Sequence, residues 1–149
     1  MARAKKRSFL RNHSLSIVAI ALLLLWLSGY FFLDPKTHWG SFFGNSIADW
    51  SGSVVVIVGT KFLYEIGSGE SRPVHAKGGA VNWRNFLRYH SLLIFLGVTG
   101  IGWAIVFSRL DPESKWGQVV GNLVSEWLQM TGLVFLTKRL VEVGSKEGH

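Results

Sequence analysis

The chain of 149 residues contains no cysteine, and this absence excludes disulfides, thiolate metal sites and a cysteine nucleophile. It also lacks a Ser–His–acid spacing, the H-E-x-x-H zinc motif and a phosphate-binding glycine loop after a strand. The segments outside its apolar blocks are too short to build a soluble pocket. We therefore expect no enzyme activity, no catalytic residue, no metal ion and no cofactor.

Charge is also scarce, and it is missing from long apolar blocks. Residues 14–33 are 20 consecutive positions without a charge, and residues 91–108 are 18. Because a helix rises ~1.5 Å per residue, about 20 apolar residues cross the ~30 Å hydrocarbon layer. Two further blocks, 39–60 and 116–137, reach this length only if each includes its single carboxylate. The sequence predicts an all-α protein with four transmembrane helices.

The second half of the chain repeats the first at a constant offset of 77 residues. Residues 7–70 align without a gap with 84–147, and 24 of the 64 positions are identical, among them Trp, His, Pro and Asn. Chance does not give ungapped agreement of that extent. We expect two tandem two-helix hairpins, residues 1–70 and 84–149, joined by a flexible cytoplasmic linker at 71–83.

The repeat also bears on the first apolar block, which follows a basic arm as the core of a signal peptide would. The block is longer than that core, no small-residue cleavage site follows it cleanly, and its counterpart in the second half is internal. We expect it to be a retained helix.

The basic residues predict the orientation of the hairpins. Thirteen Lys and Arg fall in the N-terminal arm, in residues 61–90 and in the C-terminal tail, against three in the two short turns. By the positive-inside rule both termini and the linker are cytoplasmic. Each hairpin contains two spans, so both enter and leave on the same side, as a parallel repeat with a pseudo-twofold axis along the membrane normal.

Both turns contain Asp-Pro, which joins an N-cap acceptor to the residue favoured at the first helical position. We expect the second and fourth helices to begin at Asp34-Pro35 and Asp111-Pro112. Aromatic and basic side chains near the ends of the spans should lie among lipid headgroups, some of them anionic. These interfacial residues are Arg11, His13, Trp39, Lys61, Arg88, His90, Trp116 and Lys138.

A symmetric pair of histidines, His13 and His90, is also an arrangement that holds haem or chlorophyll. Both follow an arginine that belongs in the headgroups, which favours the interfacial position. The formal net charge of +7 is accounted for by the cytoplasmic flanks, so we expect no nucleic-acid partner.

Each hairpin carries one acid in the middle of its second span, Asp49 in the first and Glu126 in the second. A carboxylate at the bilayer centre costs ~2.5–3.5 kcal/mol on the insertion scale, so it should find a partner or a proton. Asn45 and Asn122 precede these acids by one helical turn and are candidate partners, and Gln129 extends the same face. These five residues are our candidate ion or proton site.

Three interpretations of this polar face remain open. The residues can be hydrogen-bonded pins between the second and fourth helices, they can line a cation or proton path, or they can dock a partner subunit or a second copy of the chain. The exchange of Asp for Glu between the copies does not separate these interpretations.

The second hairpin, from Phe86-Leu87-Arg88 through Ser125-Glu126-Trp127-Leu128-Gln129 to Gly144-Ser145-Lys146-Glu147, resembles an uncharacterised bacterial family of small membrane proteins with a SEFLQ-like centre. Trp127 replaces the family's Phe, and the first hairpin departs further. The resemblance implies a multi-pass protein of the bacterial inner membrane and leaves its function open. We expect a structural or accessory module of the membrane or of a larger membrane complex, with a small cation or proton channel as the alternative.

Overall fold

The computed structural model describes residues 9–70 and 82–140, and these residues form helices joined by turns and loops, without a strand. The basic arm before residue 9 and most of the expected linker, residues 71–81, lie outside the described residues. The helices are α1 (Phe9–Asn12), α2 (Ser14–Phe32), α3 (His38–Val54), the π-helix η1 (Val55–Gly59), α4 (Trp83–Tyr89), α5 (Ser91–Arg109) and α6 (Lys115–Arg139). The predicted all-α class is confirmed.

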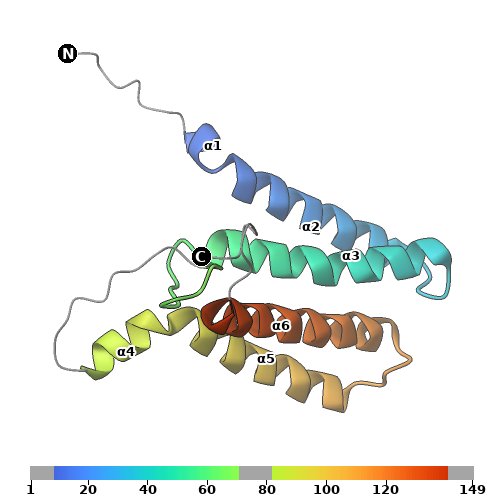
Figure 1. Ribbon diagram of the computed structural model, residues 1–149. Coiled ribbons are helices and arrows are strands. Elements are labelled where there is room, and N and C mark those ends of the chain that lie inside the picture. The colour runs from blue at the N-terminus through green and yellow to red at the C-terminus, as the bar shows by residue number, and fades with distance from the viewer. Residues whose placement is uncertain (1–8, 71–81, 141–149) are drawn as a thin grey trace, which may run out of the picture.

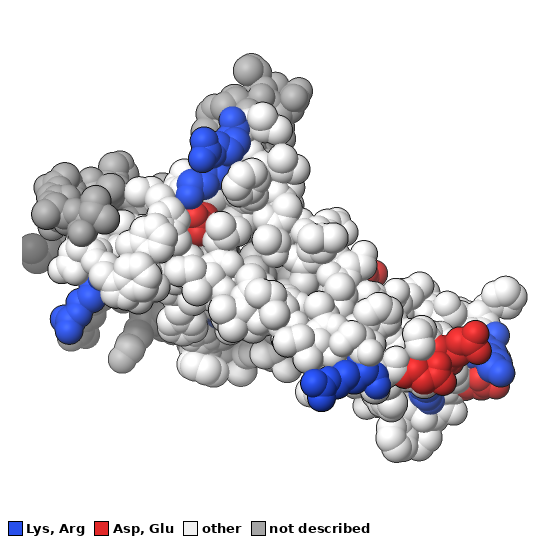
Figure 2. Space-filling view, turned by 90° about the horizontal axis from the view of Figure 1, so that it is seen from below, with Lys and Arg blue, Asp and Glu red and all other residues white. Residues whose placement is uncertain are grey.

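Four of the helical segments are long and apolar enough to cross a membrane: α2, α3 with η1, α5 and α6. The turns that join α2 to α3 and α5 to α6 lie at one end of the molecule, while α1 and α4 lie at the other (Figure 1). Figure 2 shows charged side chains gathered toward the two ends and a broad, almost uncharged belt between them. The prediction of four candidate spans in a multi-pass membrane protein is confirmed.

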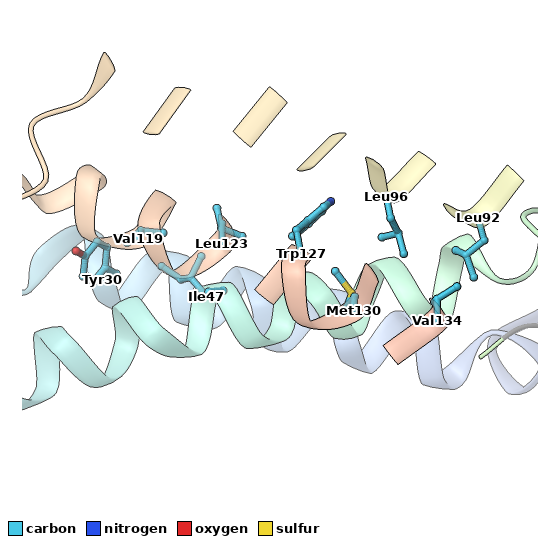
Figure 3. Packing of buried hydrophobic residues seen from close by; sticks show 10 residues of the cluster. Tyr30, Ile47, Leu92, Leu96, Val119, Leu123, Trp127, Met130 and Val134 are labelled. Atoms are coloured by element: carbon cyan, nitrogen blue, oxygen red, sulfur yellow. The ribbon is translucent and has the colours of Figure 1, made fainter. Parts of the chain in front are cut away.

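Helices α3 and α6 form the centre of the molecule, with α2 packed on α3 and α5 packed on α6 (Figure 1). The core follows α6 along its length, from Tyr30 and Val119 at one end to Leu92 and Val134 at the other (Figure 3). Large apolar side chains such as Leu24 and Val98 point outward instead. An apolar exterior of this kind suits contact with lipid.

The predicted starts of the second and fourth helices are wrong by three residues. Helix α3 begins at His38, and the side chain of its N-cap, Thr37, accepts from the Gly40 N–H at 3.0 Å. Helix α6 begins at Lys115, and the side chain of its N-cap, Ser114, accepts from the Gly117 N–H at 3.0 Å. Asp34 shapes the turn before α3 by accepting from the Lys36 N–H at 2.9 Å. The Asp34 side chain is therefore used in a hydrogen bond within the turn, and Thr37, the hydroxyl residue at the end of the turn, caps the helix instead.

The second span ends differently from the fourth. After Val54 the α-helix gives way to the π-helix η1, whereas the corresponding part of α6 remains α-helical to Arg139. Five consecutive β-branched residues, 54–58, occupy this end of the span, and such residues are crowded in an α-helix. Beyond η1 the chain turns at residues 60–70 toward the second hairpin.

Candidate functional site

The two predicted acids lie at the same height on the central helices. Asp49 is 11 residues into the span that starts at His38, and Glu126 is 11 residues into α6, which starts at Lys115. At ~1.5 Å per residue each acid is about 16 Å from the start of its helix, close to half of the ~30 Å hydrocarbon layer. Both acids thus belong to the middle of their spans.

The amides one turn before the acids bind each other across the interface of α3 and α6. The side-chain amide nitrogen of Asn122 donates to Oδ1 of Asn45 at 2.5 Å. The expected bond between each asparagine and the acid of its own helix is not formed. This hydrogen bond joins the two central helices.

The acids themselves have no such partner. Within residues 9–70 and 82–140, no hydrogen bond or ion pair reaches the carboxylate of Asp49 or of Glu126. Asp49 is exposed and Glu126 is half-buried.

A glycine makes room for Glu126 on the neighbouring helix. A Cβ atom at Gly52 would lie only 2.8 Å from Cγ of Glu126, so a larger residue there would push the acid aside. Next to this contact is an open groove of about 320 Å³, lined by Gly52, Ser53, Val56, Ile57, Glu126, Gln129, Met130 and Leu133. The groove combines an apolar wall with a carboxylate, an amide and a hydroxyl, and it can accept a cation, a proton or a basic side chain.

A second polar cluster lies where the first hairpin meets the second, and the sequence analysis missed it. Oε1 of Glu65 is 2.6 Å from Nδ1 of His90 and accepts from Nζ of Lys138 at 2.8 Å. The Glu65 side chain is fully buried, while its two partners are about one-quarter exposed. A signal was present, because Glu65, His90 and Lys138 all belong to positions that are identical in the two halves.

The other interfacial residues lie near the ends of the helices. Trp39 is exposed, Trp116 packs edge-on against Tyr30, and the Arg88 guanidinium lies 6.0 Å from the centre of the Tyr64 ring. Lys61, which we expected to extend to the headgroups, donates to Oγ of Ser16 at 2.6 Å.

His13 packs on the ring of Phe9, with centroids 4.5 Å apart, and Arg11 is exposed. In the part of the chain that the structure describes, no group of three His, Cys, Asp or Glu side chains could hold a metal ion. Comparison of the chain with protein-family models, with curated proteins and with solved structures finds no match.

Proposed function

We propose that this protein is an accessory module of a membrane complex, and that Asp49 and Glu126 bind a transmembrane helix of a partner that carries a basic side chain at mid-membrane. The single observation that carries the proposal is the position of the two acids. They are halfway along the central helices, at the surface of the four-helix unit, with no described side chain to neutralise them.

The energetic argument starts from the lipid. A carboxylate that faces hydrocarbon costs ~2.5–3.5 kcal/mol, and intramembrane acids accordingly pair with basic groups or face a polar interior. Two acids at one height attract a nearby cation more strongly than either does alone. A Lys or Arg on a partner helix supplies that charge together with hydrogen-bond donors.

The proposal includes the tandem arrangement of the chain. Three pairs of positions at the 77-residue offset support it. Asn45 contacts Asn122, and a Cβ at Gly44 would lie 3.0 Å from the Tyr30 ring just as one at Gly121 would lie 3.0 Å from the Phe107 ring. The third pair is His13 and His90, whose backbone angles are φ −120°, ψ 13° and φ −117°, ψ 17°.

The orientation and the location of the protein are part of the same proposal. The excess of Lys and Arg at the end that carries the termini supports cytoplasmic N and C termini. The resemblance of the second hairpin to a bacterial family supports the inner membrane and contact with anionic headgroups.

A small cation or proton channel is the second candidate, and the groove beside Glu126 favours it. That groove is open and carries the polar groups of Ser53, Glu126 and Gln129 along an otherwise apolar wall. A second copy of the chain that packs its own groove against this one would enclose these groups in a polar path.

One experiment separates the two candidates. The purified protein is placed in liposomes with a synthetic poly-leucine helix that carries either Lys or Leu at its centre, and their association is measured by energy transfer. We expect the Lys helix to associate several-fold more strongly than the Leu helix, and Asp49→Asn with Glu126→Gln to abolish the difference. Glu113→Gln, at an exposed turn, is the matched control and should leave it unchanged.

The same liposomes are assayed for proton and cation flux. Equal association of the two synthetic helices, together with flux that the Asp49→Asn and Glu126→Gln variants abolish, would replace the accessory function with the channel. Equal association without flux would reject both.

A further inference from the structure

The last segment of the first hairpin contacts the second hairpin where α5 begins. The Tyr64 N–H donates to Oγ of Ser91 at 2.8 Å, and the Tyr64 carbonyl accepts from the Leu92 N–H at 3.0 Å. Two residues further on, the Ile66 N–H donates to the carbonyl of Tyr89 at 2.9 Å. Residues 64–68, which we call the first tail, are thus hydrogen-bonded through their backbone to the start of α5.

Side chains of the first tail complete the contact. The buried carboxylate of Glu65 joins His90 at the start of α5 to Lys138 at the end of α6. Oγ of Ser68 lies 3.0 Å from Oγ1 of Thr137. Gly67 between them has φ +80°, a conformation that favours glycine. The first tail therefore fastens both helices of the second hairpin at one point.

Every side chain in this contact is repeated 77 residues away. Glu65, Gly67 and Ser68 correspond to Glu142, Gly144 and Ser145, which lie outside the described residues. Their receptors His90, Ser91, Thr137 and Lys138 correspond to His13, Ser14, Thr60 and Lys61 in the first hairpin. The chain therefore carries a second copy of the tail and a second copy of its receptor.

The second receptor matches the first in the backbone conformation of its histidine, whereas Thr60 and Lys61 follow the π-helix η1 and Thr137 and Lys138 lie within α6. Among the described residues it lacks a carboxylate. His13 stacks on Phe9 at 4.5 Å as His90 stacks on Phe86 at 4.7 Å, and the two histidines share one backbone conformation. Lys61 is half-buried, and no described Asp or Glu lies within ion-pair distance of it. A half-buried ammonium without a counter-ion is a costly arrangement.

We propose that residues 141–145 of the same chain dock on His13, Ser14, Thr60 and Lys61, with Glu142 accepting from Lys61 and contacting His13. The inference rests on the tandem repeat of the proposed function. It makes the contact reciprocal: each hairpin ends in a tail that fastens the other. Charge complementarity between Glu142 and Lys61 and the glycine at 144 support this occupant.

The absence of native cysteine allows a direct test in the full-length protein. The reference pair is Ser68→Cys with Thr137→Cys, because the two native hydroxyls are 3.0 Å apart and the thiols should form an intrachain disulfide on oxidation in membranes. The test pair, Ser145→Cys with Thr60→Cys, is oxidised under the same conditions. Ser145→Cys with Ser114→Cys is the negative control, because Ser114 caps the start of α6, at the opposite end of the molecule from Thr60. We expect the 60–145 pair to form as completely as the 68–137 pair, within one chain.

Disulfide formation only between chains, or at the level of the 114–145 control, overturns the proposal. A charge exchange gives the second readout. Lys61→Glu should lower the melting temperature in detergent, and adding Glu142→Lys should restore most of the loss, whereas an unchanged loss would also count against the docking. Neither measurement involves Asp49 or Glu126, so the tail can fail while partner binding stands, and the reverse.

Discussion

Asn45 and Asn122 are 77 residues apart in the chain, and their side chains are joined by an exposed hydrogen bond of 2.5 Å between α3 and α6. The contact joins equivalent positions of the two halves. It gives the first prediction, since an interhelical amide bond in a membrane protein is worth ~0.6 kcal/mol on average and up to ~1.7 kcal/mol.

We expect Asn45→Ala and Asn122→Ala to destabilise the protein by similar amounts, with a coupling of about 0.6–1.7 kcal/mol in the double variant. The measurement is reversible unfolding in mixed detergent micelles, with Ser125→Ala on the exposed face of α6 as the control. Strictly additive losses would show that the two amides do not act as a pair.

Gly44 gives a second prediction, which concerns the packing of α2 on α3. Its missing Cβ would lie 3.0 Å from the ring of Tyr30, which is 1% exposed and donates to the Lys115 carbonyl at 2.6 Å. Because that ring has no room to move, Gly44→Leu should cost about 1–3 kcal/mol. Gly97→Leu is the matched control, since a Cβ at Gly97 would have no side chain, and no backbone of another segment, within 4 Å. The free energy of unfolding of both variants is measured in detergent micelles. Equal losses for Gly44→Leu and Gly97→Leu would contradict the close packing of Gly44 against Tyr30.

The Glu65 cluster gives a third prediction. Glu65→Gln removes the carboxylate charge that contacts both Lys138 and His90, and hydrogen bonds to charged groups are worth about 1.5–3 kcal/mol. We expect a loss of that size in the free energy of unfolding, and a smaller additional loss when Lys138→Gln is combined with it. Glu113→Gln, in the exposed turn before α6, should change the free energy by less than ~0.5 kcal/mol. A loss no larger than that of the control would mean that the cluster contributes nothing to stability.

Asp49 gives the fourth prediction, and it separates docking from packing. If Asp49 serves a partner and not the fold, Asp49→Leu should leave the isolated protein as stable or more stable in a bilayer, by up to ~2.5–3.5 kcal/mol, because a lipid-facing carboxylate is removed. The same variant should lose association with the Lys-bearing synthetic helix. A clear loss of stability in the isolated protein would favour a packing function for the acid.

Much of the fold follows from hydrophobic length alone. Four blocks long enough to cross the hydrocarbon layer become four helices, because a backbone in lipid must satisfy its own hydrogen bonds. The helix starts were harder to predict, because Asp34 and Asp111 satisfy a turn and Thr37 and Ser114 cap the helix. All four residues are favoured N-cap residues, and which of them caps its helix depends on the conformation of the turn.

The candidate site divides in the same way. The sequence by itself placed Asp49 and Glu126 halfway along their spans, because depth in a helix depends only on the number of residues from its ends. Only the tertiary structure decided that Asn45 binds Asn122 and leaves both acids at the surface, and that Glu65 crosses to His90 and Lys138. Which side chains meet depends on how the helices are rotated and packed against each other. This packing is set by the whole interface and cannot be derived from the spacing of residues along one helix.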